Sequence, residues 1–178
     1  FVDEATTTQD IDLLMDTQKH LLLASTLQGR GESLLSTLQK VDPTFDLRDD
    51  QLYTAVNAAG FEVDVIRRQA KDLDPHPLRV TCAERDFWAV QVGNGAQMAS
   101  AERFAQMVVS TSGHMAMMTT LHPATFSRLK LALSRNPGRD PLKKSRDALQ
   151  AQAVAQLLEE MLPHLLPAQA DHTRPSAC

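Results

Sequence analysis

The chain has 178 residues, 43% of them apolar and 22% charged, with a formal net charge of -4 at pH 7. This composition indicates a globular protein, excludes a fibrous or disordered one, and argues against non-specific binding of nucleic acid through many phosphate contacts. No apolar run approaches the roughly 18 residues that a transmembrane helix needs, so no membrane association is expected.

A strand with one polar face is predicted from Thr6 to Leu14. Ile11 and Leu13 alternate there with Asp10 and Asp12. Alternation at period two is typical of a strand with one apolar and one polar face. Both aspartates are therefore expected to point to the same side.

A short helix is predicted next, from Glu32 to Lys40. Its leucines recur at helical spacing, and the segment ends before Asp42-Pro43. Because proline disfavours helical backbone in the residue before it, this pair is a plausible stop.

A second strand with carboxylates is predicted from Phe61 to Ile66. Its apolar residues alternate with Glu62 and Asp64. Adjacent strands in a sheet are about 4.8 Å apart. If the two predicted strands are neighbours, Asp64 can therefore converge with Asp10 and Asp12.

The middle of the chain gives weaker signals. Two prolines indicate a loop from Lys71 to Pro77. Gly93-Asn94-Gly95 is interpreted as a turn with no helix after it, and the methionines nearby are expected to pack in the core. Three further strands are predicted, with a hairpin turn at Ser112-Gly113-His114 between the last two: Phe87 to Val92, Phe104 to Ser110 and Met115 to Thr120.

The C-terminal part is predicted to be helical. One helix follows His122-Pro123 and ends at Asn136-Pro137-Gly138, and a longer one spans Pro141 to Leu162. We therefore expect an α+β fold with a mixed sheet, helices on one face and a long C-terminal helix. The expected parts are a sheet domain over 1–122, helices packed on it over 123–163 and a disordered tail over 164–178.

The predicted carboxylates suit chemistry on phosphates. Carboxylate oxygens are hard ligands for Mg²⁺. Phosphoryl and nucleotidyl transfer commonly uses two metal ions about 3.5–4 Å apart, and several anionic ligands are needed to hold that charge. Asp10, Asp12 and Asp64 are the candidates for this site.

These segments resemble the nucleotidyltransferase superfamily, which includes DNA polymerase beta, the aminoglycoside nucleotidyltransferases and the minimal nucleotidyltransferases. The superfamily pattern has two acids flanking an apolar residue on one strand and a lone acid on the next. QDIDLLMD, FEVDVI, HPATFSRLK and GRDPLKKSRDALQAQ are similar to a bacterial group of nucleotidyltransferase-like proteins. The resemblance runs from about Thr6 to Leu162.

The resemblance implies transfer of a nucleoside monophosphate from an NTP to a hydroxyl. Asp10 and Asp12 would hold two Mg²⁺ ions, and Asp64 would help to hold the ion that activates the hydroxyl and accept its proton. Glu62 lies on the same face and is a substitute candidate for one of these carboxylates. The acceptor could be a small molecule, a tRNA or a protein.

A different class of function stays open. The superfamily places a Gly-Ser or Gly-Thr pair before the first aspartates to grip the triphosphate, and the visible chain lacks it. The alternative is a non-catalytic module that binds nucleotide or protein, including a toxin–antitoxin component.

Basic residues near the C-terminal helices are candidates for binding the nucleotide: Lys130, Arg139, Lys143 and Lys144. They could donate to a triphosphate, or they could form a solvated helical face. The histidines lack the spacing of a zinc site, so zinc is not predicted. Cys82 and Cys178 lie far apart and form no metal or disulfide motif, so a reducing cytoplasm is the expected location.

Overall fold

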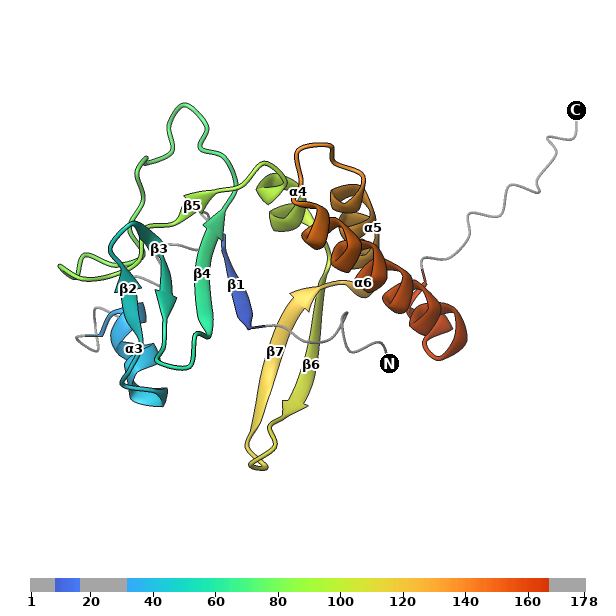
Figure 1. Ribbon diagram of the computed structural model, residues 1–178, viewed down its shortest axis with the longest axis horizontal. Helices are drawn as coiled ribbons and strands as arrows, with labels where there is room; N and C mark the ends of the chain where they lie inside the picture. Colours follow the sequence, from blue (N-terminus) through green and yellow to red (C-terminus); the bar gives the residue numbers. More distant parts are fainter. Residues whose placement is uncertain (1–8, 17–31, 167–178) are drawn as a thin grey trace, which may run out of the picture. The chain divides into compact units, whose positions relative to one another are not determined.

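The computed structural model describes residues 9–16 and 32–166, which form two compact units (Figure 1). The first unit ends at Ala101 and the second begins at Glu102. In chain order the elements are β1 (Asp10–Met15), α3 (Leu34–Val41), β2 (Asp46–Arg48), β3 (Gln51–Val56), β4 (Glu62–Arg67), β5 (Val90–Gln91), α4 (Gly95–Ser100), β6 (Arg103–Val109), β7 (Met115–Leu121), α5 (Pro123–Ser134), α6 (Pro141–Glu160) and the 3-10 helix η1 (Pro163–Leu165). None of the helices in these ranges has the length and hydropathy to cross a membrane.

The first unit is built on a five-stranded mixed sheet in the order β1-β4-β3-β2, with β5 also paired to β4. β4 runs parallel to β1 and β5 and antiparallel to β3. The two strands predicted to carry carboxylates are therefore confirmed as strands and as neighbours (Figure 1). The first three residues of the predicted first strand lie outside the described residues.

The core of this unit lies on one face of the sheet. Val63 and Val65 point to this face from β4, and Ala55 joins them from β3. In β4 the apolar half of the period-two alternation is thus the buried half. In β1 it is not, because Ile11 and Leu13 are 39% and 36% exposed. Leu35 of α3 and Phe87 from the later loop cover this layer, at 4% and 0% exposed.

The predicted helix from Glu32 to Lys40 is confirmed as α3, which begins two residues later and ends one residue later, between caps that are encoded locally. Ser33 and Ser36 form a capping box, and Asp42 is the C-cap. The buried carboxylate of Asp86 accepts hydrogen bonds from the amides of Leu34 at 3.3 Å and Leu35 at 3.1 Å. Free amides at a helix N-terminus favour an anion, so this contact fixes the helix on the unit.

Several expectations for the middle of the chain were wrong. No strand was predicted where β2 and β3 lie, because β2 has only three residues and β3 mixes apolar and polar side chains on both faces. The strand expected over Phe87 to Val92 shortens to β5, preceded by an isolated bridge between Arg79 and Trp88. The predicted loop from Lys71 to Pro77, in contrast, is confirmed, since this segment contains no strand or helix.

A helix does follow the predicted turn at Gly93-Asn94-Gly95. It is α4, and it begins at Gly95. A Cβ atom at Gly95 would lie 2.5 Å from the Cα of Arg68. Glycine is therefore required by the close approach of α4 to the end of β4, in addition to the turn.

The second unit begins with a hairpin. β6 and β7 pair antiparallel as a separate two-stranded sheet, with Gly113 at φ 83° in the predicted turn. The expectation that the methionines pack in a core is wrong here, because Met107, Met115 and Met117 are 53%, 70% and 62% exposed. Among the described residues the two strands pair only with each other, and such a ribbon offers no second layer to cover these side chains.

The two predicted C-terminal helices are confirmed as α5 and α6. Pro123 and Pro141 occupy the first turns, where the missing N–H costs nothing, and Asp140 caps α6. The helices pack on each other around Leu129, Ala151 and Leu158. The segment expected to be disordered begins within η1, and its residues from 167 lie outside the described part of the chain.

Candidate functional site

The register between β1 and β4 places their carboxylates on one face of the sheet. Asp12 is the direct partner of Asp64, and Asp10 is the partner of Glu62. Residues that pair across neighbouring strands point to the same side, and successive pairs stand about 7 Å apart along the strands. Four carboxylates thus share the face opposite to the core.

Two residues on the strands that follow β4 in the sheet, β3 and β2, bind these carboxylates. The hydroxyl of Thr54 on β3 donates to Oδ1 of Asp64 at 2.5 Å, and Thr54 is 1% exposed. Arg48 Nη1 donates to Oε1 of Glu62 at 3.1 Å. The charge of Glu62 is therefore balanced by an ion pair, whereas Asp64 receives a hydrogen bond from a neutral hydroxyl.

These carboxylates fit a cation site that substrate phosphates complete, and they do not fit a site made of protein ligands alone. Within residues 9–16 and 32–166, no three His, Cys, Asp or Glu side chains form a group that could hold a metal ion. Mg²⁺ in enzymes is usually bound by one or two carboxylates, with water and substrate phosphates completing its shell. The facing pair of Asp12 and Asp64, with Asp10 one pleat further, fits an ion that arrives with a phosphate ligand. The role of these aspartates as metal ligands stays a prediction.

The predicted nucleotide-binding cations lie in the second unit, where three of the four have a partner within the protein. Lys130 Nζ and Arg139 Nε bind the two oxygens of Asp147 at 2.9 Å each, and Asp147 is 0% exposed. Burial alone would raise the pKa of Asp147, but hydrogen bonds from both cations hold this pKa below its usual range. Lys144 Nζ donates to the Pro137 carbonyl at 3.2 Å, and Lys143 is exposed. Their role towards a nucleotide also stays a prediction.

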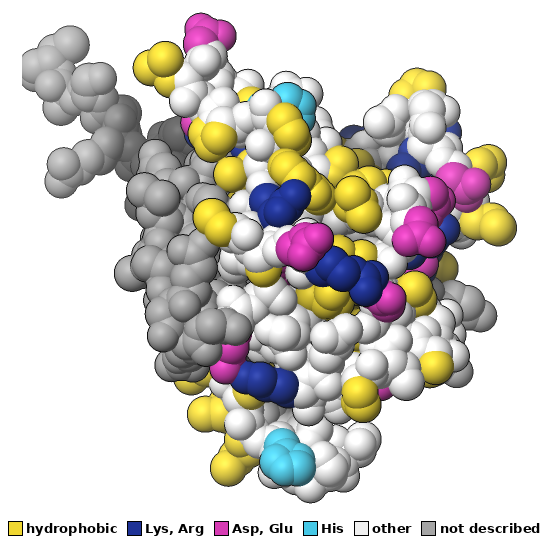
Figure 2. Space-filling view, turned by 90° about the vertical axis from the view of Figure 1, so that its left-hand side faces the viewer, with side chains coloured by type: hydrophobic (Ala, Val, Ile, Leu, Met, Phe, Trp, Pro, Cys, Tyr) yellow, Lys and Arg dark blue, Asp and Glu magenta, His cyan; other side chains and the backbone are white. Residues whose placement is uncertain are grey.

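Opposite charges are interleaved on the face of the molecule drawn in Figure 2. Dark blue and magenta side chains alternate there and do not gather into a patch of one sign. The first unit contains exposed ion pairs such as Arg48–Asp50 and Arg85–Asp46, at 3.4 and 2.7 Å. The described side chains on this face therefore form no basic patch of the kind that a long polyanion would need.

The fold and the acidic face together define a class. The fold is α+β with a mixed sheet. In this sheet an acid-apolar-acid strand lies beside a parallel strand with a further acid, and this arrangement is nucleotidyltransferase-like. A family model described as Nucleotidyltransferase matches residues 1–174, and the chain belongs to this family. The predicted resemblance is thereby confirmed at the level of the family. No curated protein and no solved structure matches the chain significantly.

Sequence reasoning missed Thr54 and Arg48 because it missed the strands that carry them. Thr54 stands directly opposite Asp64 in the antiparallel register of β3 and β4. The segment from Gln51 to Val56 contains tyrosine, threonine and valine, which favour strands. Recognition of this strand as the neighbour of β4 would have placed a hydroxyl beside the carboxylate.

Proposed function

We propose that the chain is a metal-dependent enzyme that transfers a nucleoside monophosphate from an NTP to a hydroxyl group. Membership of the nucleotidyltransferase family supports a transferase. The observation that most supports the finer statement is the direct pairing of Asp12 with Asp64, two residues from Asp10, on the solvent-facing side of the sheet. Mg²⁺ and an NTP are the proposed cofactor and donor.

The proposed roles follow from the contacts of each carboxylate. Thr54 engages Oδ1 of Asp64, and no described residue donates to Oδ2, so that oxygen can receive the proton of the acceptor hydroxyl. The hydroxyl oxygen then forms a bond to the α-phosphorus, the bond from this phosphorus to the bridging oxygen breaks, and pyrophosphate leaves. Mg²⁺, when bound beside Asp10 and Asp12, would neutralise the charge on the phosphates.

Substitution of single carboxylates tests this proposal. We expect Asp12→Asn and Asp64→Asn each to lower transfer of labelled nucleoside monophosphate by more than about 100-fold, as loss of charge at a reacting centre does. Stability in urea should stay equal or rise slightly, because repulsion between neighbouring carboxylates falls. Asp72→Asn is the matched control, since Asp72 is exposed in the loop after β4 and makes no contact with these residues in the structure.

The same assay separates the enzyme from a non-catalytic module. Full activity of Asp12→Asn would contradict the proposed roles. Binding of NTP by the unmodified chain, with no transfer to any acceptor tested and no pyrophosphate released, would instead support a module that binds nucleotide without turnover.

A further inference from the structure

Glu62 lies on the acidic face of the sheet and has no role in the proposed reaction. Its register partner on β1 is Asp10, and it stands two residues before Asp64 on β4. Side chains placed in this way could bind the same cation as the aspartates, since they share one face of neighbouring strands. In the structure, however, the partner of Glu62 is a cation of the protein itself, the guanidinium of Arg48.

The ion pair with Arg48 draws the carboxylate of Glu62 away from β1. Nη1 of Arg48 donates to Oε1 of Glu62 at 3.1 Å, and Arg48 is the last residue of β2. The order β1-β4-β3-β2 places β3 between β2 and β4 (Figure 1), so these two strands are about 10 Å apart. The two side chains therefore meet across β3, on the side of β4 that is opposite to Asp10 and Asp12.

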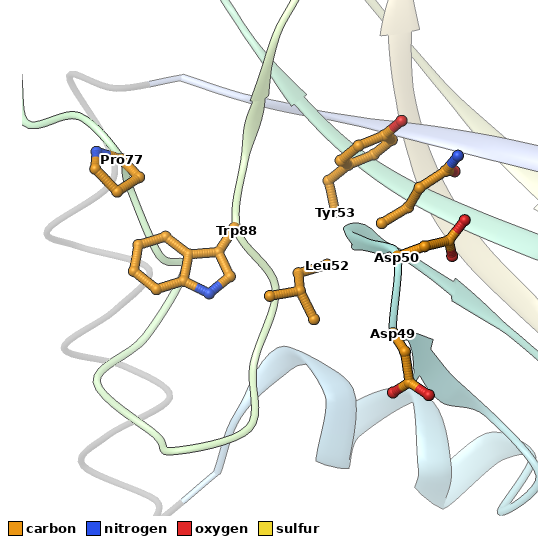
Figure 3. Close-up of a pocket in the computed structure, with 7 residues that line it drawn as sticks. Asp49, Asp50, Leu52, Tyr53, Pro77 and Trp88 are labelled. Carbon is orange, nitrogen blue, oxygen red and sulfur yellow. The ribbon is translucent and has the colours of Figure 1, made fainter.

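Arg48 has a second acidic partner in the turn between β2 and β3. Its Nε lies 3.4 Å from Oδ1 of Asp50. Figure 3 shows Asp50 in this turn, where it lines an open pocket of about 340 Å³ together with Asp49 and Tyr53. The side chain of Asp50 is 66% exposed and that of Glu62 is 38% exposed, so water screens the contact with Asp50 more strongly. Glu62 is thus the closer and more enclosed partner of Arg48.

We propose that Arg48 keeps Glu62 out of the metal site, so that cation binding depends on the phosphates of the substrate. The inference rests on the proposed function, in which Mg²⁺ binds beside Asp10 and Asp12. With Glu62 held by Arg48, water and the NTP complete the shell of the ion. A fourth unpaired carboxylate would hold the ion without a nucleotide and would repel the triphosphate. Arg48 touches neither substrate nor ion and is a positioning residue.

Binding of Mn²⁺ to the full chain in the absence of nucleotide tests this proposal. Mn²⁺ takes the same oxygen ligands as Mg²⁺, and electron paramagnetic resonance measures the free ion directly. In Arg48→Met the carboxylate of Glu62 is released towards Asp10, so we expect the affinity for Mn²⁺ to rise by at least about tenfold. The pair is partly exposed, and such pairs contribute little to stability, so the variant should unfold at the same urea concentration as the unmodified chain.

A matched control removes another arginine from an ion pair in the same unit. Arg85 binds Asp46 at 2.7 Å, and both side chains are more than half exposed. Arg85→Met changes the net charge as Arg48→Met does. Because salt screens the field of an exposed charge, this control should leave the affinity for Mn²⁺ within about twofold of that of the unmodified chain.

A double-mutant cycle distinguishes release of Glu62 from a general change in charge. Glu62→Gln alone should change the affinity for Mn²⁺ by less than about twofold, whereas in Arg48→Met it should cancel the gain. A change in charge alone predicts the same loss from Glu62→Gln in both backgrounds. Such additive effects, or an affinity of Arg48→Met no higher than that of the unmodified chain, would overturn the proposal. The readout needs no nucleotide transfer, so its failure is distinct from failure of the proposed function, which the transfer assay with Asp12→Asn decides.

Discussion

The hydroxyl of Thr54 fixes the position of one carboxylate on the acidic face. It is fully enclosed and donates to Asp64 across the β3–β4 pair. A carboxylate on an exposed strand face would otherwise sample several rotamers. Thr54 thus acts through Asp64 and has no contact of its own with a substrate in the proposed reaction, which makes it a positioning residue.

Removal of this hydroxyl tests the positioning role. We expect Thr54→Val to lower transfer by about 10- to 100-fold, as loss of an outer partner of a metal ligand does, and to raise the Mg²⁺ concentration needed for half-maximal rate. Thr54→Ser keeps the hydroxyl and should recover most of both values. A merely structural role predicts a change in unfolding midpoint with the same Mg²⁺ dependence, so the metal titration distinguishes the two.

Asp86 is a second residue whose role could not be predicted from the sequence around it, and this role is to stabilise the fold. Its carboxylate accepts from two amides of α3 and, at 2.6 Å, from the Thr81 hydroxyl. Asp86→Ala leaves these donors buried without a partner, so the free energy of unfolding should fall by about 1–3 kcal/mol. Urea unfolding followed by circular dichroism measures this, with exposed Glu84→Ala as control. Equal midpoints for both variants would show that water replaces the carboxylate.

Among the helices and strands, those that could be predicted have a long run of periodic residues or have capping signals next to their ends. The alternation around Asp10 and Asp64 predicted two strands, and proline and glycine signals bounded α3, α5 and α6. β2 and β5 have three and two residues, too few to show a period. Their existence depends on pairing with β3 and β4, which is a tertiary contact that no local pattern records. Thr54 lies in β3, which has six residues but mixes apolar and polar side chains on both faces, so no period-two pattern marked it.

The α5–α6 pair contains a buried ion cluster that makes its stability depend on pH. Lys130 and Arg139 hold the pKa of Asp147 below its unfolded value of 3.8. Because the folded pKa is depressed, the stabilisation is complete above 3.8 and is lost as pH falls from there through the folded pKa. Helical circular dichroism in urea should therefore show unfolding midpoints that decline below about pH 4.

Asp147→Asn isolates this contribution. It leaves two partly buried cations without a counter-charge, so we expect a loss of about 2–4 kcal/mol at neutral pH and a flatter acid dependence. Glu159→Gln removes an exposed charge from the same helix and should retain the steep decline of the unmodified chain. Parallel acid profiles for Asp147→Asn and the unmodified chain would assign the pH dependence to other carboxylates.

At the scale of the whole molecule, apolar burial is distributed unequally between the two units. The described part of the first contains a continuous cluster of eleven buried apolar residues, including Val65, Phe87 and Ala55. In the described part of the second, the buried apolar residues are Leu129, Ala151 and Leu158. Burial of apolar surface is the main stabilising term in folding, so the first unit is expected to be the more stable of the two.

Amide hydrogen exchange of the full chain tests this inequality. Amides of β3 and β4, each in the middle of the sheet, should exchange slowest, because they open only when the cluster around Val65 is lost. Amides of β6 and β7 should exchange at least about tenfold faster, since their ribbon pairs with no third strand among the described residues and three of its four methionines are more than half exposed. Protection of the hairpin equal to that of β4 would contradict this order and would mean that another surface covers the hairpin in solution.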